Sequence, residues 1–152
     1  MTTLTGKQND FLEAIQDLVE LEYDIREVYK EAIAKLIKSD YKIKLNEFCQ
    51  DHEHYIMELS KLLQNHNEQA PIKPSVIKPL ISKGKVALAE IMGDQMILAA
   101  MANNEIDTNK AYERINSRHD RWEDATEMLK RMLDDEKKHK KWLDENKQQS
   151  NS

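Results

Sequence analysis

Residues 129–143 read LKRMLDDEKKHKKWL, and this stretch decides the fold. Leu129, Met132 and Leu143 recur at the three- and four-residue steps that define one face of an α-helix. The same face passes through Glu136 and His139, one turn apart, where further hydrophobic residues would be expected. An unpaired carboxylate in a protein core is costly. The stretch therefore predicts a helix whose buried face contains an acid and an imidazole that need a partner.

Similar apolar stripes, bounded by turn-forming residues, recur along the rest of the chain. The predicted helices span four ranges: 8–38, 41–65, 86–116 and 120–146. The last of them opens on Asp120 and Glu123, which have the spacing of a capping box. Residues 66–85 hold all 3 prolines of the chain and predict an extended linker. Since 152 residues suit one domain, residues 1–152 are predicted to form a single all-α four-helix bundle.

The lengths of the connections constrain the topology of this bundle. Short turns join the first helix to the second and the third to the fourth, so each pair is predicted to form an antiparallel hairpin. The linker of about twenty residues is long enough to cross the length of the bundle. It could equally be a long loop in a plain up-down bundle, and connection lengths alone leave both topologies open.

Composition excludes several classes of function. The formal net charge is -5 and no basic stripe with interleaved aromatic residues is present, so nucleic acid is not an expected partner. No apolar run is long enough to span a membrane, and the opening residues contain no export signal. The single cysteine allows no internal disulfide. We expect a cytoplasmic protein that binds neither nucleic acid nor membrane.

Acidic residues and histidine interrupt the apolar stripes of the other helices as well. Glu22 fills a gap in the first stripe and Glu105 fills the corresponding gap in the third. The second helix offers Asp51 and His54, whose spacing matches that of the pair in the fourth. His52 is an alternative to His54, because it lies closer to the centre of the second stripe.

The order of these residues suggests an internal repeat. A helix with a lone glutamate is followed by a helix with an acid and a histidine, and this sequence occurs twice. Each lone glutamate is followed seven residues later by a tyrosine on the same face, Tyr29 and Tyr112. The two halves are predicted to be related by a pseudo-twofold axis.

The chain resembles the ferritin-like superfamily of di-iron carboxylate proteins over most of its length. That superfamily takes a glutamate from each of two helices and Glu-x-x-His from each of the other two. The last helix, with Asp135, Glu136, His139, Trp142 and Leu143, is especially similar to bacterioferritin and rubrerythrin. The resemblance implies a crossover between the hairpins.

The resemblance also implies a role for each candidate residue. Two iron ions, or manganese, would be held by terminal, bridging and nitrogen ligands, with two tyrosines donating hydrogen bonds to the carboxylates. The terminal ligands would be Glu22 and Glu105, the bridging ligands Asp51 and Glu136, the nitrogen ligands His54 and His139, and the hydrogen-bonding tyrosines Tyr29 and Tyr112.

The sequence departs from the family at several points. Asp51 stands where glutamate is usual, and His52 follows it where bacterioferritins have a haem-ligating methionine, so haem is not expected. Dioxygen or peroxide is the expected reactant, in oxidation of ferrous iron or reduction of peroxide. A di-iron oxygenase acting on an organic substrate and a non-catalytic partner-binding protein with a decayed site remain alternatives. The wholly polar tail, residues 144–152, argues against a 24-subunit shell, and the resemblance implies a homodimer or another small oligomer.

Overall fold

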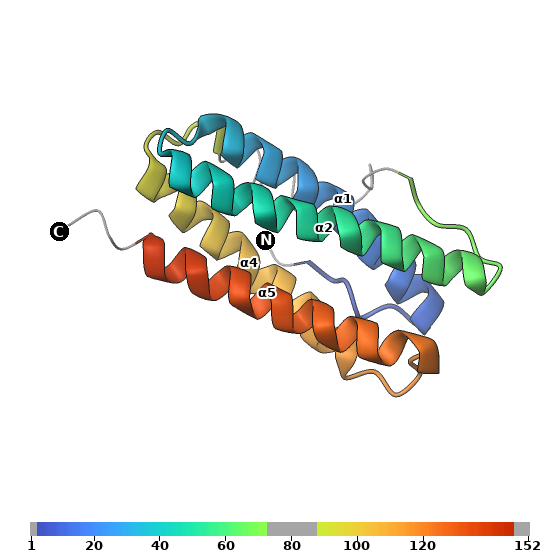
Figure 1. Ribbon diagram of the computed structural model, residues 1–152. Coiled ribbons are helices and arrows are strands. Elements are labelled where there is room, and N and C mark those ends of the chain that lie inside the picture. The colour runs from blue at the N-terminus through green and yellow to red at the C-terminus, as the bar shows by residue number, and fades with distance from the viewer. Residues whose placement is uncertain (1–2, 73–87, 148–152) are drawn as a thin grey trace.

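The computed structural model describes residues 3–72 and 88–147, and these residues form an all-α bundle without a strand (Figure 1). A short 3₁₀ helix, η1, precedes the last of the four long helices and spans Glu123–Ala125. The long helices are α1 (Phe11–Lys35), α2 (Ser39–Asn65), α4 (Asp94–Asn116) and α5 (Thr126–Asn146). The predicted fold class is confirmed.

The helices pack as two antiparallel hairpins, α1 with α2 and α4 with α5 (Figure 1). The start of α4 lies against the α1–α2 turn, because the backbone N–H groups of Ile37 and Lys38 donate to the Asp94 carboxylate, each at 2.8 Å. At the opposite end, the His66 ring that follows α2 stacks on Trp122, just before η1, with ring centroids 3.8 Å apart. Thus α2 and α4 run parallel, and the chain crosses the length of the bundle between them. Of the two topologies that the connection lengths leave open, the structure has the crossover.

The start of the third helix differs from the prediction of residue 86. In the part of the chain that the structure describes, Leu88 and Ala89 form a short helical turn and α4 begins only at Asp94. Gly93 precedes it with a φ of 95°, a left-handed conformation that an α-helix cannot continue through. Most of the predicted linker, 66–85, lies outside the described residues, as do residues 86 and 87.

The predicted capping box of the last helix is also wrong. The Asp120 carboxylate accepts two hydrogen bonds from the Arg118 guanidinium, at 2.8 and 2.9 Å, so it is engaged elsewhere. The chain then passes through η1, and α5 begins at Thr126. By contrast, Asp10 caps α1 as a typical N-cap residue, accepting from the Glu13 N–H at 2.8 Å.

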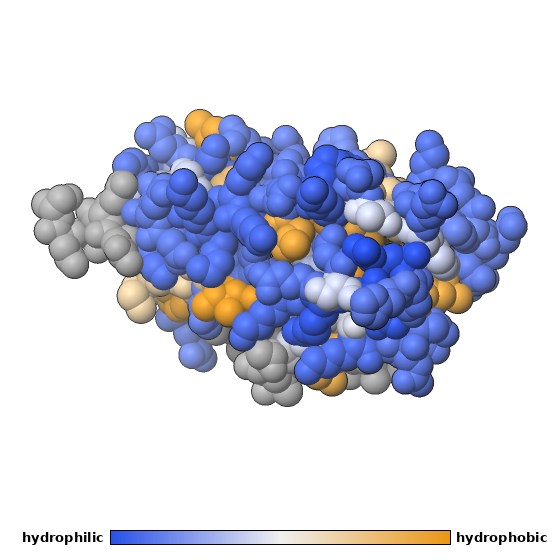
Figure 2. Space-filling view, turned by 90° about the horizontal axis from the view of Figure 1, so that it is seen from below, coloured by the Kyte–Doolittle hydropathy of each residue, from blue (hydrophilic) through white to orange (hydrophobic). Residues whose placement is uncertain are grey.

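The core is continuous and apolar except near its middle. Each fully buried leucine, isoleucine or tyrosine on the inner stripes contributes roughly 1.5–3 kcal/mol relative to an exposed one. Among the described residues, five acidic or histidine side chains interrupt these stripes and are at most 2% exposed: Glu22, His52, Glu105, Glu136 and His139. The outer surface seen from below is mainly hydrophilic, with small separate apolar patches (Figure 2). No helix among the described residues is both long and apolar enough to cross a membrane.

Candidate metal centre

The five buried acidic and histidine side chains come from all four long helices. Glu22 lies on α1, His52 on α2, Glu105 on α4, and Glu136 and His139 on α5. Each occupies a position on the inner stripe of its helix, so helix packing brings them to one depth in the bundle. Burying ions without partners is strongly unfavourable, and this cluster therefore needs protons, hydrogen bonds or a cation.

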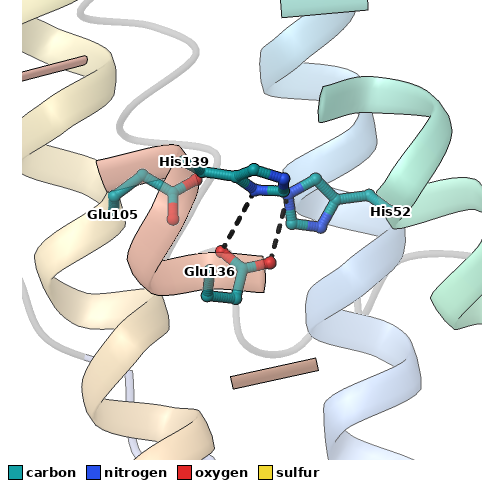
Figure 3. Close-up of side chains that lie close together, drawn as sticks. All are labelled: His52, Glu105, Glu136 and His139. Atoms are coloured by element: carbon teal, nitrogen blue, oxygen red, sulfur yellow. Dashed lines mark ion pairs between the residues drawn. The ribbon is translucent and has the colours of Figure 1, made fainter. Parts of the chain in front are cut away.

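Four of these side chains converge (Figure 3). One ligand-type atom from each of His52, Glu105, Glu136 and His139 lies within 4.8 Å of the others. The carboxylate of Glu136 lies between the two rings, with Oε1 3.3 Å from His52 Nε2 and Oε2 3.8 Å from His139 Nδ1. This group of residues could hold a metal ion.

Each imidazole is oriented by a carboxylate that contacts the ring nitrogen facing away from the other converging side chains. His52 Nδ1 lies 2.6 Å from Glu22 Oε2, and His139 Nε2 lies 2.8 Å from Asp51 Oδ2. A carboxylate accepts a hydrogen bond from the ring nitrogen that faces it, so the proton of a neutral imidazole stays on that outer nitrogen. The inner nitrogens, His52 Nε2 and His139 Nδ1, then present lone pairs to the cluster.

Two tyrosines hold the lone glutamates in a crossed arrangement. The Tyr29 hydroxyl of α1 donates to Glu105 Oε1 of α4 at 2.7 Å, and the Tyr112 hydroxyl of α4 donates to Glu22 Oε1 of α1 at 2.5 Å. These bonds fix the carboxylate planes across the bundle. They are the contacts that the resemblance implies for the two tyrosines.

In the described part of the chain, the polar atoms that face the middle of the cluster lack hydrogen-bond partners, as the ligand atoms of a cation site would. Five of them have no hydrogen-bond partner among the residues that the structure describes: His52 Nε2, Glu105 Oε2, Glu136 Oε1, Glu136 Oε2 and His139 Nδ1. A buried polar atom without a partner costs roughly 1–3 kcal/mol, and more when it is charged. All five are metal-ligand atoms, and a divalent cation among them would satisfy every one. The residues present therefore fit a metal ion.

Burial and neighbouring charges shift the pKa values of three side chains in the cluster. Burial raises the pKa of Glu105 well above its usual value, and the negative charge of Glu136 adds to the effect. Burial raises the pKa of Glu136 to about 7, although the nearby positive charge of His52 opposes the shift. For His52, burial lowers the pKa, but Glu136 and Glu22 outweigh it and bring the pKa to about 9. A cation would replace the protons that these groups otherwise retain.

Three of the predicted ligands are not among the four converging side chains: Glu22, whose two oxygens contact Tyr112 and His52, and the two residues of α2, Asp51 and His54. His54 is exposed on α2, whereas the alternative, His52, is one of the four converging side chains. Asp51 is only partly buried and contacts His139 from the outer side, where it orients the ring and does not face the inner donors. The physical reason is that positions 51 and 54 lie off the stripe of Phe48, Tyr55 and Leu59.

The buried histidine of α2 could have been found from its register. His52 continues the steps from Phe48 to Tyr55 and Leu59, so it lies at the centre of the apolar stripe. The Glu-x-x-His spacing of the last helix favours instead the pair that starts one residue earlier, Asp51 and His54. Helical phase was the better signal, because burial depends on phase and not on the residue types in a motif.

A surface pocket of about 360 Å³ lies outside His139. His139 forms part of its wall and also contacts the buried cluster, and the Phe48 ring stacks on the imidazole with centroids 4.2 Å apart. The pocket is lined by Lys44, Glu47, Phe48, Asp51, Asp135, Lys138, His139 and Trp142. Through His139 this pocket adjoins the buried cluster.

Comparison with known proteins gives a family but no activity. No curated protein and no solved structure matches the chain. The model of one family, described as Domain of unknown function (DUF2383), matches residues 10–118, which include α1, α2 and α4. Glu136 and His139 on α5 lie beyond the matched region. Because the match covers more than half of the 152 residues, the chain belongs to the DUF2383 family.

Proposed function

We propose that this protein is a ferritin-like metalloprotein that uses a buried iron centre, with manganese as the alternative metal, for redox chemistry with peroxide or dioxygen. In this reaction ferrous iron is oxidised to ferric iron. With hydrogen peroxide as oxidant, two ferrous ions, bound together or one after the other, give up one electron each, the O–O bond breaks, and two protons complete two water molecules.

The single observation that carries the proposal is the set of five inward-facing donor atoms without hydrogen-bond partners in the described part of the chain. They comprise three carboxylate oxygens and two imidazole nitrogens. Such a mixed oxygen and nitrogen set suits iron or manganese, whereas the thiolates preferred by softer metals are absent from it. Donors this well oriented also argue against a decayed site in a purely structural protein.

The fold supports the same function. Ligands that project from four helices into the middle of a crossover bundle are the arrangement found in ferritin-like carboxylate proteins. The crossed bonds of Tyr29 to Glu105 and of Tyr112 to Glu22 hold the carboxylates, and Asp51 holds His139. Preorganised ligands of this kind restrict the geometry available to the ion. A bound iron or manganese ion would supply a one-electron couple that no side chain of the cluster can supply.

The pocket beside His139 favours a small oxidant over an organic substrate. Five of its eight lining residues are charged, and the others are Phe48, His139 and Trp142. An oxygenase acting on an apolar molecule would need an apolar route to the metal, and this pocket does not provide one. Peroxide and dioxygen need no binding surface for an apolar substrate, so we favour them as the reactants.

The proposal is tested with purified protein reconstituted anaerobically with ferrous iron, or separately with Mn²⁺, and then desalted. The iron-loaded protein is mixed with hydrogen peroxide or aerated buffer, and ferric iron is followed by absorbance. We expect retained metal and ferrous oxidation faster than in buffer. The Glu136→Leu variant should show neither property.

His54→Ala is the matched control, because it removes a histidine that lies outside the cluster. It should bind and oxidise iron like the unaltered protein. If the unaltered protein retains neither metal and oxidises iron no faster than buffer, the proposed function is wrong. If it retains metal but His54→Ala abolishes retention, the assignment of the buried cluster as the centre is wrong.

A further inference from the structure

The two halves of the bundle correspond residue by residue once the structure sets the register. Glu22 and Tyr29 precede Glu105 and Tyr112 by 83 residues. Two hydrogen bonds extend the correspondence to the other helices. Asp51 contacts the ring of His139, and Asp135 accepts from the Tyr55 hydroxyl at 2.8 Å. The equivalent pairs are therefore Asp51 with Asp135, His52 with Glu136 and Tyr55 with His139, each separated by 84 residues.

This register shows that the centre is asymmetric. The half on α5 offers Glu136-x-x-His139, while the equivalent positions on α2 are His52 and Tyr55. One half thus has an imidazole where the other has a carboxylate, and a phenol where the other has an imidazole. The Tyr55 hydroxyl donates its hydrogen bond to Asp135. The α2 half therefore lacks both a bridging carboxylate and an aligned nitrogen ligand at position 55.

Glu22 is fully engaged by other side chains. Its Oε1 accepts from the Tyr112 hydroxyl at 2.5 Å, and its Oε2 lies 2.6 Å from His52 Nδ1. Glu105, the equivalent residue on α4, uses only Oε1 and leaves Oε2 without a hydrogen-bond partner in the described residues. Glu22 therefore acts as the carboxylate that orients His52, as Asp51 does for His139.

The separation of the inner donors fits one ion. Metal–ligand bonds to oxygen and nitrogen are about 2.0–2.2 Å, so donors on opposite sides of one ion lie up to roughly 4.4 Å apart. Two ions in a shared site are about 3.5–4 Å apart, which places their outermost donors roughly 6–8 Å from each other. The converging atoms of the four side chains lie within 4.8 Å. This span lets the four side chains share one ion, and a second ion would need donors beyond these four.

From these observations we infer that the centre holds a single metal ion, ligated by His52, Glu105, Glu136 and His139, and that Glu22 is a positioning residue for His52. The inference rests on the proposed metal-dependent function. The resemblance implies two ions, whereas we infer one. In a symmetric two-ion site, positions 52 and 55 would carry a glutamate and a histidine like those of α5, but here they are His52 and Tyr55.

Metal stoichiometry tests the inference directly. The purified full chain is dialysed anaerobically against ferrous iron over a range of concentrations, and separately against Mn²⁺, and bound metal is determined by mass spectrometry against protein concentration. We expect saturation at one ion per chain. Two tightly bound ions per chain would overturn the inference but leave the proposed function intact. No bound ion would refute the proposed function itself.

A symmetrising double substitution, His52→Glu with Tyr55→His, provides a gain-of-binding test. It supplies a carboxylate opposite Glu136, places an imidazole beside Asp135 and releases Glu22 from its bond to position 52. We expect two ions per folded chain. Circular dichroism verifies folding. One ion in the folded double variant would contradict the assignment of these two positions as the cause of single occupancy.

The positioning role of Glu22 has its own test. Glu22→Gln should leave the stoichiometry at one ion per chain and weaken binding by about 10–100-fold, the usual effect of losing a carboxylate that orients a metal-bound imidazole. Glu105→Gln, at the equivalent position on α4, removes an inner donor and should cost more affinity than Glu22→Gln. An equal or larger loss in Glu22→Gln would identify Glu22 as a direct ligand and overturn its assignment.

Discussion

A buried carboxylate stabilises a protein only when something compensates for its loss of hydration. Glu136 has two oxygens without hydrogen-bond partners among the described residues and is fully buried between two imidazoles. In the absence of a cation it lowers the free energy of unfolding, because burial favours its uncharged form. Glu136 is thus retained at a cost to the stability of the apo-protein, as is expected for a metal ligand.

We expect Glu136→Leu to separate stability from metal binding. Leucine removes the unsatisfied oxygens and continues the apolar stripe of α5, so the apo-protein should be as stable as before or up to about 1–3 kcal/mol more stable. Metal retention should be lost. Urea denaturation and metal analysis of the same preparations check both. Glu145→Leu, at an exposed position of α5, is the control and should leave metal binding unchanged. An unfolded Glu136→Leu variant, or a folded one that retains the metal, contradicts the account.

A second acid is predicted to reduce stability at neutral pH. Burial raises the pKa of Asp24 to about 7, and repulsion from Glu20, Asp17 and Glu27 adds to the shift. The folded chain thus holds this proton more tightly than the unfolded chain. The contribution of Asp24 to the free energy of unfolding is therefore complete below pH 3.8 and is lost as the pH rises through about 7. Asp24→Asn should raise the midpoint of unfolding, increasingly from pH 5 to pH 8. If the rise in the midpoint of unfolding were instead largest at pH 5, the predicted pH dependence would be wrong.

The residues of the centre show how far sequence can locate a site. Glu22, Glu105, Glu136 and His139 were identifiable because each interrupts an apolar stripe at its centre. On α2, motif spacing predicts Asp51 and His54, one residue before the two positions, 52 and 55, that correspond to Glu136 and His139. Hydrogen bonds across the bundle, such as those of Asp51 and Asp135, revealed the correct register. These contacts depend on tertiary packing and leave no periodic signal in the sequence.

At the scale of elements, helix interiors were predictable and helix starts were not. The apolar periodicity of α1 and α2 predicted both helices to within three residues at each end. The start of α4 differs by eight residues, because the backbone conformation at Gly93 overrides a pattern that would allow an earlier start. The start of α5 differs because Arg118 competes for the Asp120 carboxylate. Both effects are local and specific, so periodicity cannot report them.

Two glycines provide a matched test of how the N-terminal segment packs on α4. Gly6 and Gly93 have nearly the same φ, 98° and 95°, so alanine is strained by about 1–2 kcal/mol at either position. A Cβ on Gly6 would also lie 2.7 Å from the Cβ of Arg114 and 3.3 Å from the Ala111 carbonyl oxygen, whereas Gly93 has open space. We expect Gly6→Ala to lower the free energy of unfolding by about 1–3 kcal/mol more than Gly93→Ala.

Urea denaturation of the two glycine variants measures the difference. The segment before α1 is also held by Arg114, whose Nη1 donates to the carbonyl oxygens of Thr3 and Thr5 at 3.0 and 2.8 Å. The Gly6→Ala penalty should therefore appear as loss of cooperative stability of the bundle. Equal losses in the two variants would mean that the segment can shift away from α4 at little cost.

For the whole molecule, we predict a homodimer or another small oligomer in solution. The large apolar side chains that are exposed in the described residues are dispersed over several elements: Leu4, Ile37, Ile43, Met57, Ile72, Met92, Met96 and Ile106. Most soluble oligomers are closed and twofold symmetric. Light scattering should give a small multiple of the 17.8 kDa chain, with a dimer as the first expectation. A mass near twenty-four chains with hundreds of irons per particle would indicate iron storage instead.

The central claim is that a metal ion binds inside the bundle, at the depth of Glu136 (Figure 3). The most direct measurement is anomalous diffraction at the iron absorption edge from crystals of the iron-loaded protein. The account predicts one strong peak per chain, within bonding distance of His52 Nε2, His139 Nδ1 and the carboxylates of Glu105 and Glu136. Iron located only at surface sites, or no peak inside the bundle in iron-loaded crystals, would contradict it.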